Sequence, residues 1–158
     1  MGVLEASGLI YRLHPYHRNV TKRPLKTPKI YFLDTGLCSY LTGWPSPQSL
    51  EACAMSGAIL ETYLFAEILK SYWHQGKTPY FYYYLDTDHK EVDLVIESDQ
   101  MLYPIEFKKT ANRSQSAFKN FSVLKKLDKA IGPGALICFV GKDLALSREV
   151  TAIPVSYL

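Results

Sequence analysis

Cysteine is scarce in this 158-residue chain, and its spacing disfavours two ways of stabilising a fold. The three cysteines, Cys38, Cys53 and Cys138, are odd in number, far apart and never in a CxxC pair. Neither a disulfide framework nor a zinc site built on thiolates is indicated. A reducing compartment, and therefore the cytoplasm, fits this usage best.

Long apolar runs are also absent. The longest, residues 135–140, is far shorter than the roughly 20 residues that a membrane helix requires, and the N-terminus lacks a signal-peptide pattern. We therefore expect no membrane partner. A P-loop is lacking too, because Gly141-Lys142 is followed by Asp143 and has no upstream glycine at the required spacing.

The excess of positive charge is small. A formal net charge of +3 permits a nucleic-acid partner without arguing for one. The basic residues Arg18, Lys22, Arg23 and Lys26 fall between two predicted strands, residues 9–13 and 29–33. This segment could contact phosphates, but a solvated loop is the commoner explanation. The 47% of hydrophobic and 21% of charged residues are typical of a globular protein.

Residues 91–109 predict a β-hairpin, because two apolar runs flank a polar turn at 98–100. Alternation along a strand places Asp93 on a charged face, opposite Val92, Leu94 and Ile96. Glu106 and Lys108 share a face of the second strand in the same way. Two further acids on the face of Asp93, Glu91 and Glu97, are interpreted as solvated.

Helical patterns lie on both sides of the hairpin. Apolar periodicity predicts a helix over residues 50–74, and Ser114 is a potential N-cap of an amphipathic helix carrying Phe118, Phe121, Leu124 and Leu127. Nearer the N-terminus, residues 3–8 read as the last turn of a helix, and Asp34 is a good N-cap for a helix over 35–42. Further strands are expected at 80–84, 135–140 and 152–155. The order helix, three strands, helix, strand indicates an α/β fold around a mixed sheet.

The spacing of charged residues within this order adds a functional indication. Asp93 is followed thirteen residues later by Glu106-Phe107-Lys108, and the preceding helix carries Glu61 four residues after Gly57. This arrangement resembles the PD-(D/E)xK nuclease superfamily. The resemblance implies a restriction-endonuclease-like core, in which helices flank a mixed central sheet.

A closer resemblance covers nearly the full length. The segments TPKIYFLDTGLCSYLTGW, SGAILETYLFAEILKS, KEVDLVIE and YPIEFKKT resemble the C-terminal domain of unknown function of many prokaryotic AAA-type ATPases. The resemblance implies that residues 1–45 are the tail of a winged-helix-like segment and a linker, and that 46–158 are a nuclease-like domain. It also implies an ATPase domain in a preceding part of a longer chain, and it allows a homo-oligomer.

In the superfamily pattern the hairpin residues have defined roles. Mg²⁺ or Mn²⁺ would be bound by Asp93, Glu106 and the carbonyl of Phe107, with Glu61 approaching directly or through a metal-bound water. Lys108 would lie beside the attacking water and stabilise negative charge in the transition state. The implied function is a metal-dependent DNA endonuclease.

Two other functions stay open at the level of sequence. The domain could keep the nuclease fold without catalysis and bind DNA or a partner protein. Alternatively, the charges could form a structural network, in which Lys108 pairs with Asp93 or Glu106 and the domain serves oligomerisation.

Overall fold

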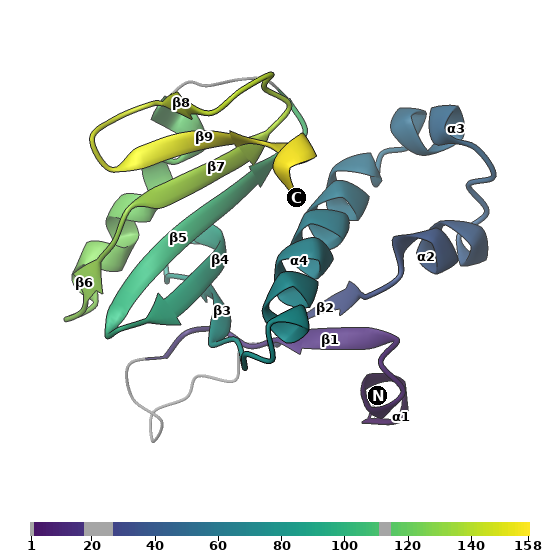
Figure 1. Ribbon diagram of the computed structural model, residues 1–158, viewed down its shortest axis with the longest axis horizontal. Helices are drawn as coiled ribbons and strands as arrows, with labels where there is room; N and C mark the ends of the chain where they lie inside the picture. The colour runs from purple at the N-terminus through teal and green to yellow at the C-terminus, as the bar shows by residue number, and fades with distance from the viewer. Residues whose placement is uncertain (1, 18–26, 111–114) are drawn as a thin grey trace.

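A computed structural model of the chain describes residues 2–17, 27–110 and 115–158, and its central feature is one mixed β-sheet (Figure 1). The α-helices are α1 (Gly2–Ala6), α2 (Thr35–Leu41), α3 (Pro47–Ala52) and α4 (Ser56–His74). The strands are β1 (Ile10–Leu13), β2 (Lys29–Phe32), β3 (Phe81–Leu85), β4 (Glu91–Ser98), β5 (Met101–Lys108), β6 (Ala130–Ile131), β7 (Gly134–Cys138), β8 (Leu144–Ala145) and β9 (Val150–Pro154). Within the described residues, 3₁₀ segments span Gln115–Ala117, Lys119–Lys126 and Val155–Tyr157.

The sheet has the order β3-β4-β5-β7-β9-β8, with β6 pairing to β5. Strands β3, β4 and β5 are antiparallel because short turns connect them, whereas β5, β7 and β9 are parallel. The connection from β5 to β7 contains the 3₁₀ segments Gln115–Ala117 and Lys119–Lys126, since a parallel pair needs a long crossover. Strands β1 and β2 form a separate antiparallel hairpin, the β1–β2 hairpin.

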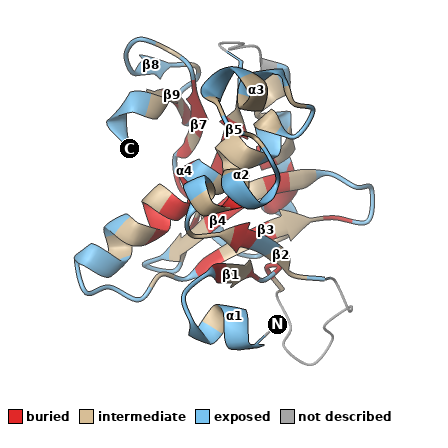
Figure 2. Ribbon diagram, turned by 90° about the vertical axis from the view of Figure 1, so that its right-hand side faces the viewer, coloured by how far each residue is buried: buried red, intermediate tan, exposed pale blue. Residues whose placement is uncertain are grey.

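Two hydrophobic clusters cover the two faces of the sheet. On one face α4 packs Leu64 and Phe65 against Leu94, Ile105 and Phe107. On the other face the 3₁₀ segment Lys119–Lys126 and the sheet share a second cluster, which includes Val92, Val95, Leu102, Phe121 and Leu124. The helices α1 and α3 contain no buried residue, and neither carries the red of buried residues in Figure 2. The expected mixed sheet flanked by helices is therefore confirmed.

The predicted hairpin over 91–109 is confirmed, and its turn has a specific geometry. Asp99 and Gln100, with φ of 50° and 63°, lie between the paired residues Ser98 and Met101. A two-residue loop with both φ angles positive is a type I′ turn, whose twist matches that of the strands. The predicted N-cap of α2 is also confirmed, since the side chain of Asp34 accepts a hydrogen bond from the N–H of Leu37 at 2.9 Å.

The strict alternation predicted for the first strand is wrong at Asp93. Tyr82 pairs with Val95 and Tyr84 with Val92, so two β4 residues, Asp93 and Leu94, face the single residue between those two tyrosines. This is a β-bulge, which inserts one residue and shifts the alternation. Val92 and Val95 consequently enter one hydrophobic cluster while Leu94 enters the other.

Two helix predictions are wrong in detail. The helix predicted over 50–74 is divided, because Ser46 and Ser49 cap a separate helix at Pro47 and the backbone becomes extended at Cys53. The helix predicted after Ser114 is a pair of 3₁₀ segments, although Phe121 and Leu124 are buried as expected. Ser114 and the basic segment with Arg18, Lys22, Arg23 and Lys26 lie outside the described residues.

None of the described helices combines the length and the apolar character that a membrane crossing requires.

Candidate active site

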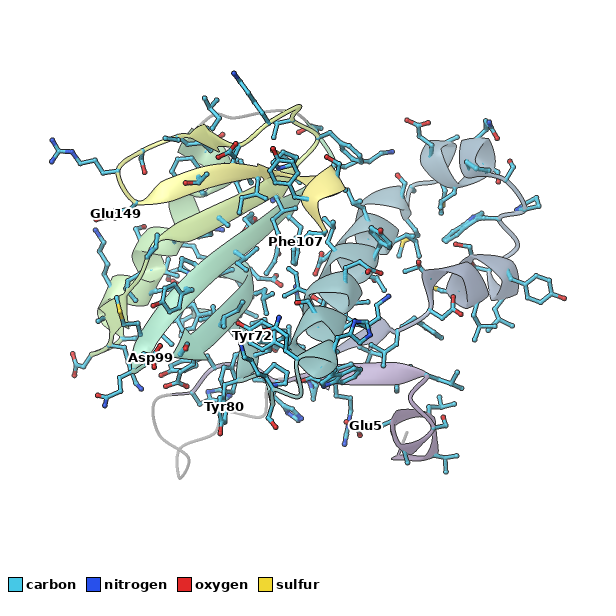
Figure 3. The ribbon with its side chains drawn as sticks, viewed as in Figure 1. Glu5, Tyr72, Tyr80, Asp99, Phe107 and Glu149 are labelled. Atoms are coloured by element: carbon cyan, nitrogen blue, oxygen red, sulfur yellow. The ribbon has the colours of Figure 1, made fainter. Side chains whose placement is uncertain are left out.

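Strands β4 and β5 separate at the bulge, and the carboxylate of Asp93 lies where they part. Within the described strands, the β4–β5 pairing runs from Ser98 and Met101 to Leu94 and Ile105 and stops there. Beyond that pair, Asp93 Oδ2 accepts a hydrogen bond from the N–H of Phe107 at 3.0 Å. The Phe107 side chain lies between β5 and α4 (Figure 3). The bulge thus replaces a backbone ladder bond by a bond to a carboxylate.

Glu106 and Lys108 follow on β5 and pair with each other. Lys108 Nζ donates a hydrogen bond to Glu106 Oε1 at 2.6 Å. Glu106 is only 6% exposed, and its other oxygen, Oε2, is buried without a hydrogen-bond partner among the described residues. Burial and the charge of Asp93 raise the pKa of Glu106 to about 7. Glu106 Oε2 is therefore available to bind a cation, and the charge of a cation there would stabilise the ionised carboxylate.

Asp93 has a raised pKa for the same kind of reason. Burial, followed by the charge of Glu61, raises the pKa of Asp93 to about 6, against the opposing effects of the Phe107 N–H and of Lys29 and Lys108. Because Asp93 interacts with Glu61 from α4 and with Glu106 from β5, the three acids share one electrostatic environment. Asp93 and Glu106 are the two acids of the predicted D…ExK pattern, and Glu61 is the predicted acid of the preceding helix.

Lys29 from β2 also lies among these acids, although no motif in the sequence marks it as a site residue. Its Nζ lies 3.0 Å from Glu61 Oε1, 2.5 Å from Glu91 Oε1 and 3.9 Å from Asp93 Oδ1. Burial acts to lower the pKa of Lys29, but the three carboxylates outweigh it and raise the pKa above its usual value. Lys29 is therefore a cation at neutral pH.

Glu61 is held by a second residue of the same hairpin. The hydroxyl of Tyr31 donates a hydrogen bond to Glu61 Oε1 at 2.6 Å. Burial and the charge of Glu61 raise the pKa of that hydroxyl, so that it remains a donor.

The start of α4 is tied to the end of β5, since Lys109 Nζ donates to Ser56 Oγ at 2.9 Å. Glu67, six residues further along α4, pairs instead with Lys70 at 2.5 Å.

The acids outnumber the lysines in this cluster, which we call the carboxylate cluster and define as Glu61, Glu91, Asp93, Glu106, Lys29 and Lys108. Four carboxylates against two ammonium groups leave two negative charges when all are ionised. Among the described residues, no three acids, histidines or cysteines converge closely enough to form a ready metal site. The donor set nevertheless suits Mg²⁺, which binds through one or two carboxylates and retains several waters.

Glu91, interpreted from the sequence as a solvated acid, is 39% exposed, and it also pairs with Lys29, which reaches across from β2. Glu97 pairs with Lys129 at 2.5 Å, away from the cluster. The sequence contains one local signal for the role of the β1–β2 hairpin, which is that Lys29 and Tyr31 share one face of a short strand. This pattern does not indicate which acids the two side chains contact.

Comparison with known families matches two parts of the chain. Residues 56–158, well over half of the chain, match the model of a family described as a domain of unknown function (DUF4143). Residues 1–48 match a second family, also described as a domain of unknown function (DUF8612). The carboxylate cluster draws on both segments, since Lys29 lies within residues 1–48 and the acids lie within residues 56–158.

The chain is similar to two curated mycobacterial proteins. The uncharacterized protein Mb2031c of Mycobacterium bovis and the uncharacterized protein Rv2008c of Mycobacterium tuberculosis are each 31% identical to it over 146 residues. The match covers 92% of this chain and 32% of each relative, so the chain spans about a third of their length. No solved structure matches the chain significantly.

Proposed function

The chain belongs to the DUF4143 family, and from the geometry of its carboxylate cluster we propose that it is a metal-dependent nuclease domain. The proposed reaction is cleavage of phosphodiester bonds in DNA, by the C-terminal part of a larger ATPase. One observation carries the proposal. Asp93, Glu106 and Lys108 interact with one another where β4 and β5 separate, and Glu106 Oε2 is left without a partner among the described residues.

The restriction-endonuclease-like form of the fold is part of the same proposal. Helix α4, the antiparallel strands β3 to β5, the 3₁₀ segments and the parallel strand β7 follow one another in the order expected for that fold. The greater length of the mycobacterial relatives leaves room for an ATPase domain in the longer protein.

The charge balance favours a divalent cation. The carboxylate cluster lacks two positive charges, and this deficit contributes to the raised pKa values of Asp93 and Glu106. Those two carboxyls would hold the cation, and the unpaired oxygen Oε2 of Glu106 would then become one of its ligands. Bound there, Mg²⁺ or Mn²⁺ would supply a Lewis acid that stabilises charge on the phosphate and lowers the pKa of a bound water.

Lys108 would act as a fixed positive charge beside the phosphate. Burial acts to lower the pKa of Lys108, but its hydrogen bond to Glu106 and the charges of Glu106, Asp93 and Glu61 together outweigh this and raise the pKa above its usual value. A group that stays protonated cannot serve as the general base, but it can stabilise an anionic transition state. Glu61, whose Oε1 is already bonded to Lys29 and Tyr31, would support the site indirectly.

Nicking of supercoiled plasmid DNA by the purified protein tests the proposal. We expect activity with Mg²⁺ or Mn²⁺, its loss with a chelator, and a reduction on the order of 10²–10³-fold in Asp93→Ala and in Lys108→Ala. Asp143→Ala and Lys142→Ala are matched controls at exposed positions and should retain full activity. Cleavage that persists in both site variants would contradict the proposal.

A second candidate function is a non-catalytic module that binds DNA or a partner protein. The observation that favours it is the pairing of Lys29 and Lys108 with the acids, which already provides two counter-charges without a metal. In this case the plasmid stays intact while gel shifts appear and weaken steeply with salt. A structural role in a homo-oligomer predicts neither cleavage nor a gel shift.

A further inference from the structure

Lys29 reaches the acids from outside the nuclease-like segment. It lies on β2, in the part of the chain that matches the DUF8612 family, while Glu61, Glu91 and Asp93 belong to the DUF4143 part. Its Nζ is within hydrogen-bond distance of Glu61 and Glu91 and 3.9 Å from Asp93. The D…ExK pattern contains no position for this residue.

Several contacts hold the β1–β2 hairpin at this place, so Lys29 does not move as a free surface lysine would. The Tyr31 ring stacks on Phe65 of α4 with 4.1 Å between centroids, and the Tyr31 hydroxyl bonds to Glu61. The hydroxyl of Tyr83 on β3 donates to the carbonyl of Thr27 at 2.8 Å. Lys29 Nζ also lies 5.6 Å from the centre of the Tyr83 ring, where a cation is attracted to the aromatic face.

We propose that Lys29 is a built-in counter-cation, which keeps the carboxylate cluster assembled without a metal and competes with a divalent cation for its acids. This inference rests on the proposed metal site of the nuclease function. Its physical basis is that an ammonium group and a metal ion satisfy the same carboxylate charge. A metal ion that binds at Asp93 is therefore repelled by Lys29. It also finds fewer carboxylates whose negative charge is still uncompensated.

Removal of the charge of Lys29 provides the test. In Lys29→Gln, which keeps a hydrogen-bond donor, we expect Mn²⁺ alone to bind about tenfold more tightly or better, measured by isothermal titration calorimetry. The melting temperature of the metal-free variant should fall, because Glu61 and Glu91 lose their counter-charge. Added Mn²⁺ should restore most of that loss, since the metal binds the folded state.

Two control variants isolate the effect of charge at this position. Lys29→Arg keeps the positive charge and should retain the wild-type affinity for Mn²⁺. Lys70→Gln removes a lysine that pairs with Glu67 on the same helix as Glu61 but outside the cluster, and it should not change the affinity. Equal or weaker Mn²⁺ binding by a folded Lys29→Gln variant would overturn the inference.

The outcome is separable from that of the proposed function. If the wild-type protein nicks DNA but Lys29→Gln binds Mn²⁺ no more tightly, the nuclease proposal stands and the counter-cation proposal fails. If Lys29→Gln binds Mn²⁺ more tightly and no variant nicks DNA, the counter-cation proposal stands and the nuclease proposal fails. If Mn²⁺ binds to neither protein, both are overturned.

Discussion

At the scale of single residues, Asp93 and Glu106 have the least favourable surroundings for a negative charge among the described acids. Both are largely buried, each is close to another acid, and the pKa values rise to about 6 and about 7. The compensating contacts, from the Phe107 N–H to Asp93 and from Lys108 to Glu106, do not cancel this effect. Such residues are a feature of functional sites, where an incoming ligand supplies the missing charge.

The raised pKa values predict a definite dependence of stability on pH. The folded protein holds these two protons at pH values where the unfolded chain, with carboxyl pKa values of about 4, has released them. The free energy of unfolding of the metal-free protein should therefore fall as pH rises from about 4 to about 7. Asp93→Asn removes one ionisable group and should raise the melting temperature at pH 8 by about 3 °C or more.

The measurement is thermal unfolding by circular dichroism at pH 5 and pH 8 in the presence of a chelator. The gain from Asp93→Asn should be larger at pH 8, where the wild-type acid is ionised. Asp143→Asn, in an exposed loop, should change the melting temperature equally little at both pH values. A gain for Asp93→Asn that is larger at pH 5 would contradict the assigned direction of the shift.

At the scale of elements, the β4–β5 hairpin places Asp93 and Glu106 near each other, and its turn sets the register. The turn requires positive φ at Asp99 and Gln100. This conformation costs a glutamine, as at position 100, about 1 kcal/mol relative to glycine. The bulge at Asp93 then determines where the two strands part. The position of the site along the hairpin thus depends on one turn and one inserted residue.

Gln100→Gly is expected to stabilise the protein, because glycine occupies positive φ without steric cost and Asp-Gly is favoured in type I′ turns. A gain of about 1 kcal/mol would raise the melting temperature by about 2–4 °C. The matched control is Gln48→Gly in α3, where glycine should lower it by a similar or smaller amount. Destabilisation by Gln100→Gly in thermal unfolding would show that the turn has a different geometry.

At the scale of the whole molecule, the N-terminal hairpin and the sheet share one hydrophobic cluster. Leu13 and Tyr31 are buried together with Leu64, Phe65 and Phe107, so the segments matched by the two families share this core. Lys29 adds ion pairs across the same boundary. We therefore expect the hairpin and the sheet to unfold as one cooperative unit.

Leu13→Ala tests this cooperativity, because Leu13 is fully buried between the hairpin and the rest of the core. The change should destabilise the protein by about 2–5 kcal/mol and shift a single thermal transition downward. Leu41→Ala, at a position that is 65% exposed, is the control and should have little effect. Two separate transitions by calorimetry, with only one shifted, would contradict a shared core.

Local patterns in the sequence determined the elements that carry the acids. Apolar periodicity, the polar turn at 98–100 and the spacing from Asp93 to Glu106 depend on residues close together in the chain, which is why the hairpin and the helix with Glu61 were predicted. The same local reasoning failed at the 3₁₀ segments, where a helical pattern alone does not fix how the backbone packs.

Only the tertiary structure decided how Glu61, Asp93 and Glu106 come together and which lysines balance their charge. The bulge at Asp93 arises from the pairing of β4 with its neighbours, and no residue in the strand marks it. Lys29 precedes Asp93 by more than sixty residues and reaches it only because Tyr31, Phe65 and Leu13 pack the hairpin against α4. Long-range packing creates this contact, so a charge pattern read along the chain could not contain it.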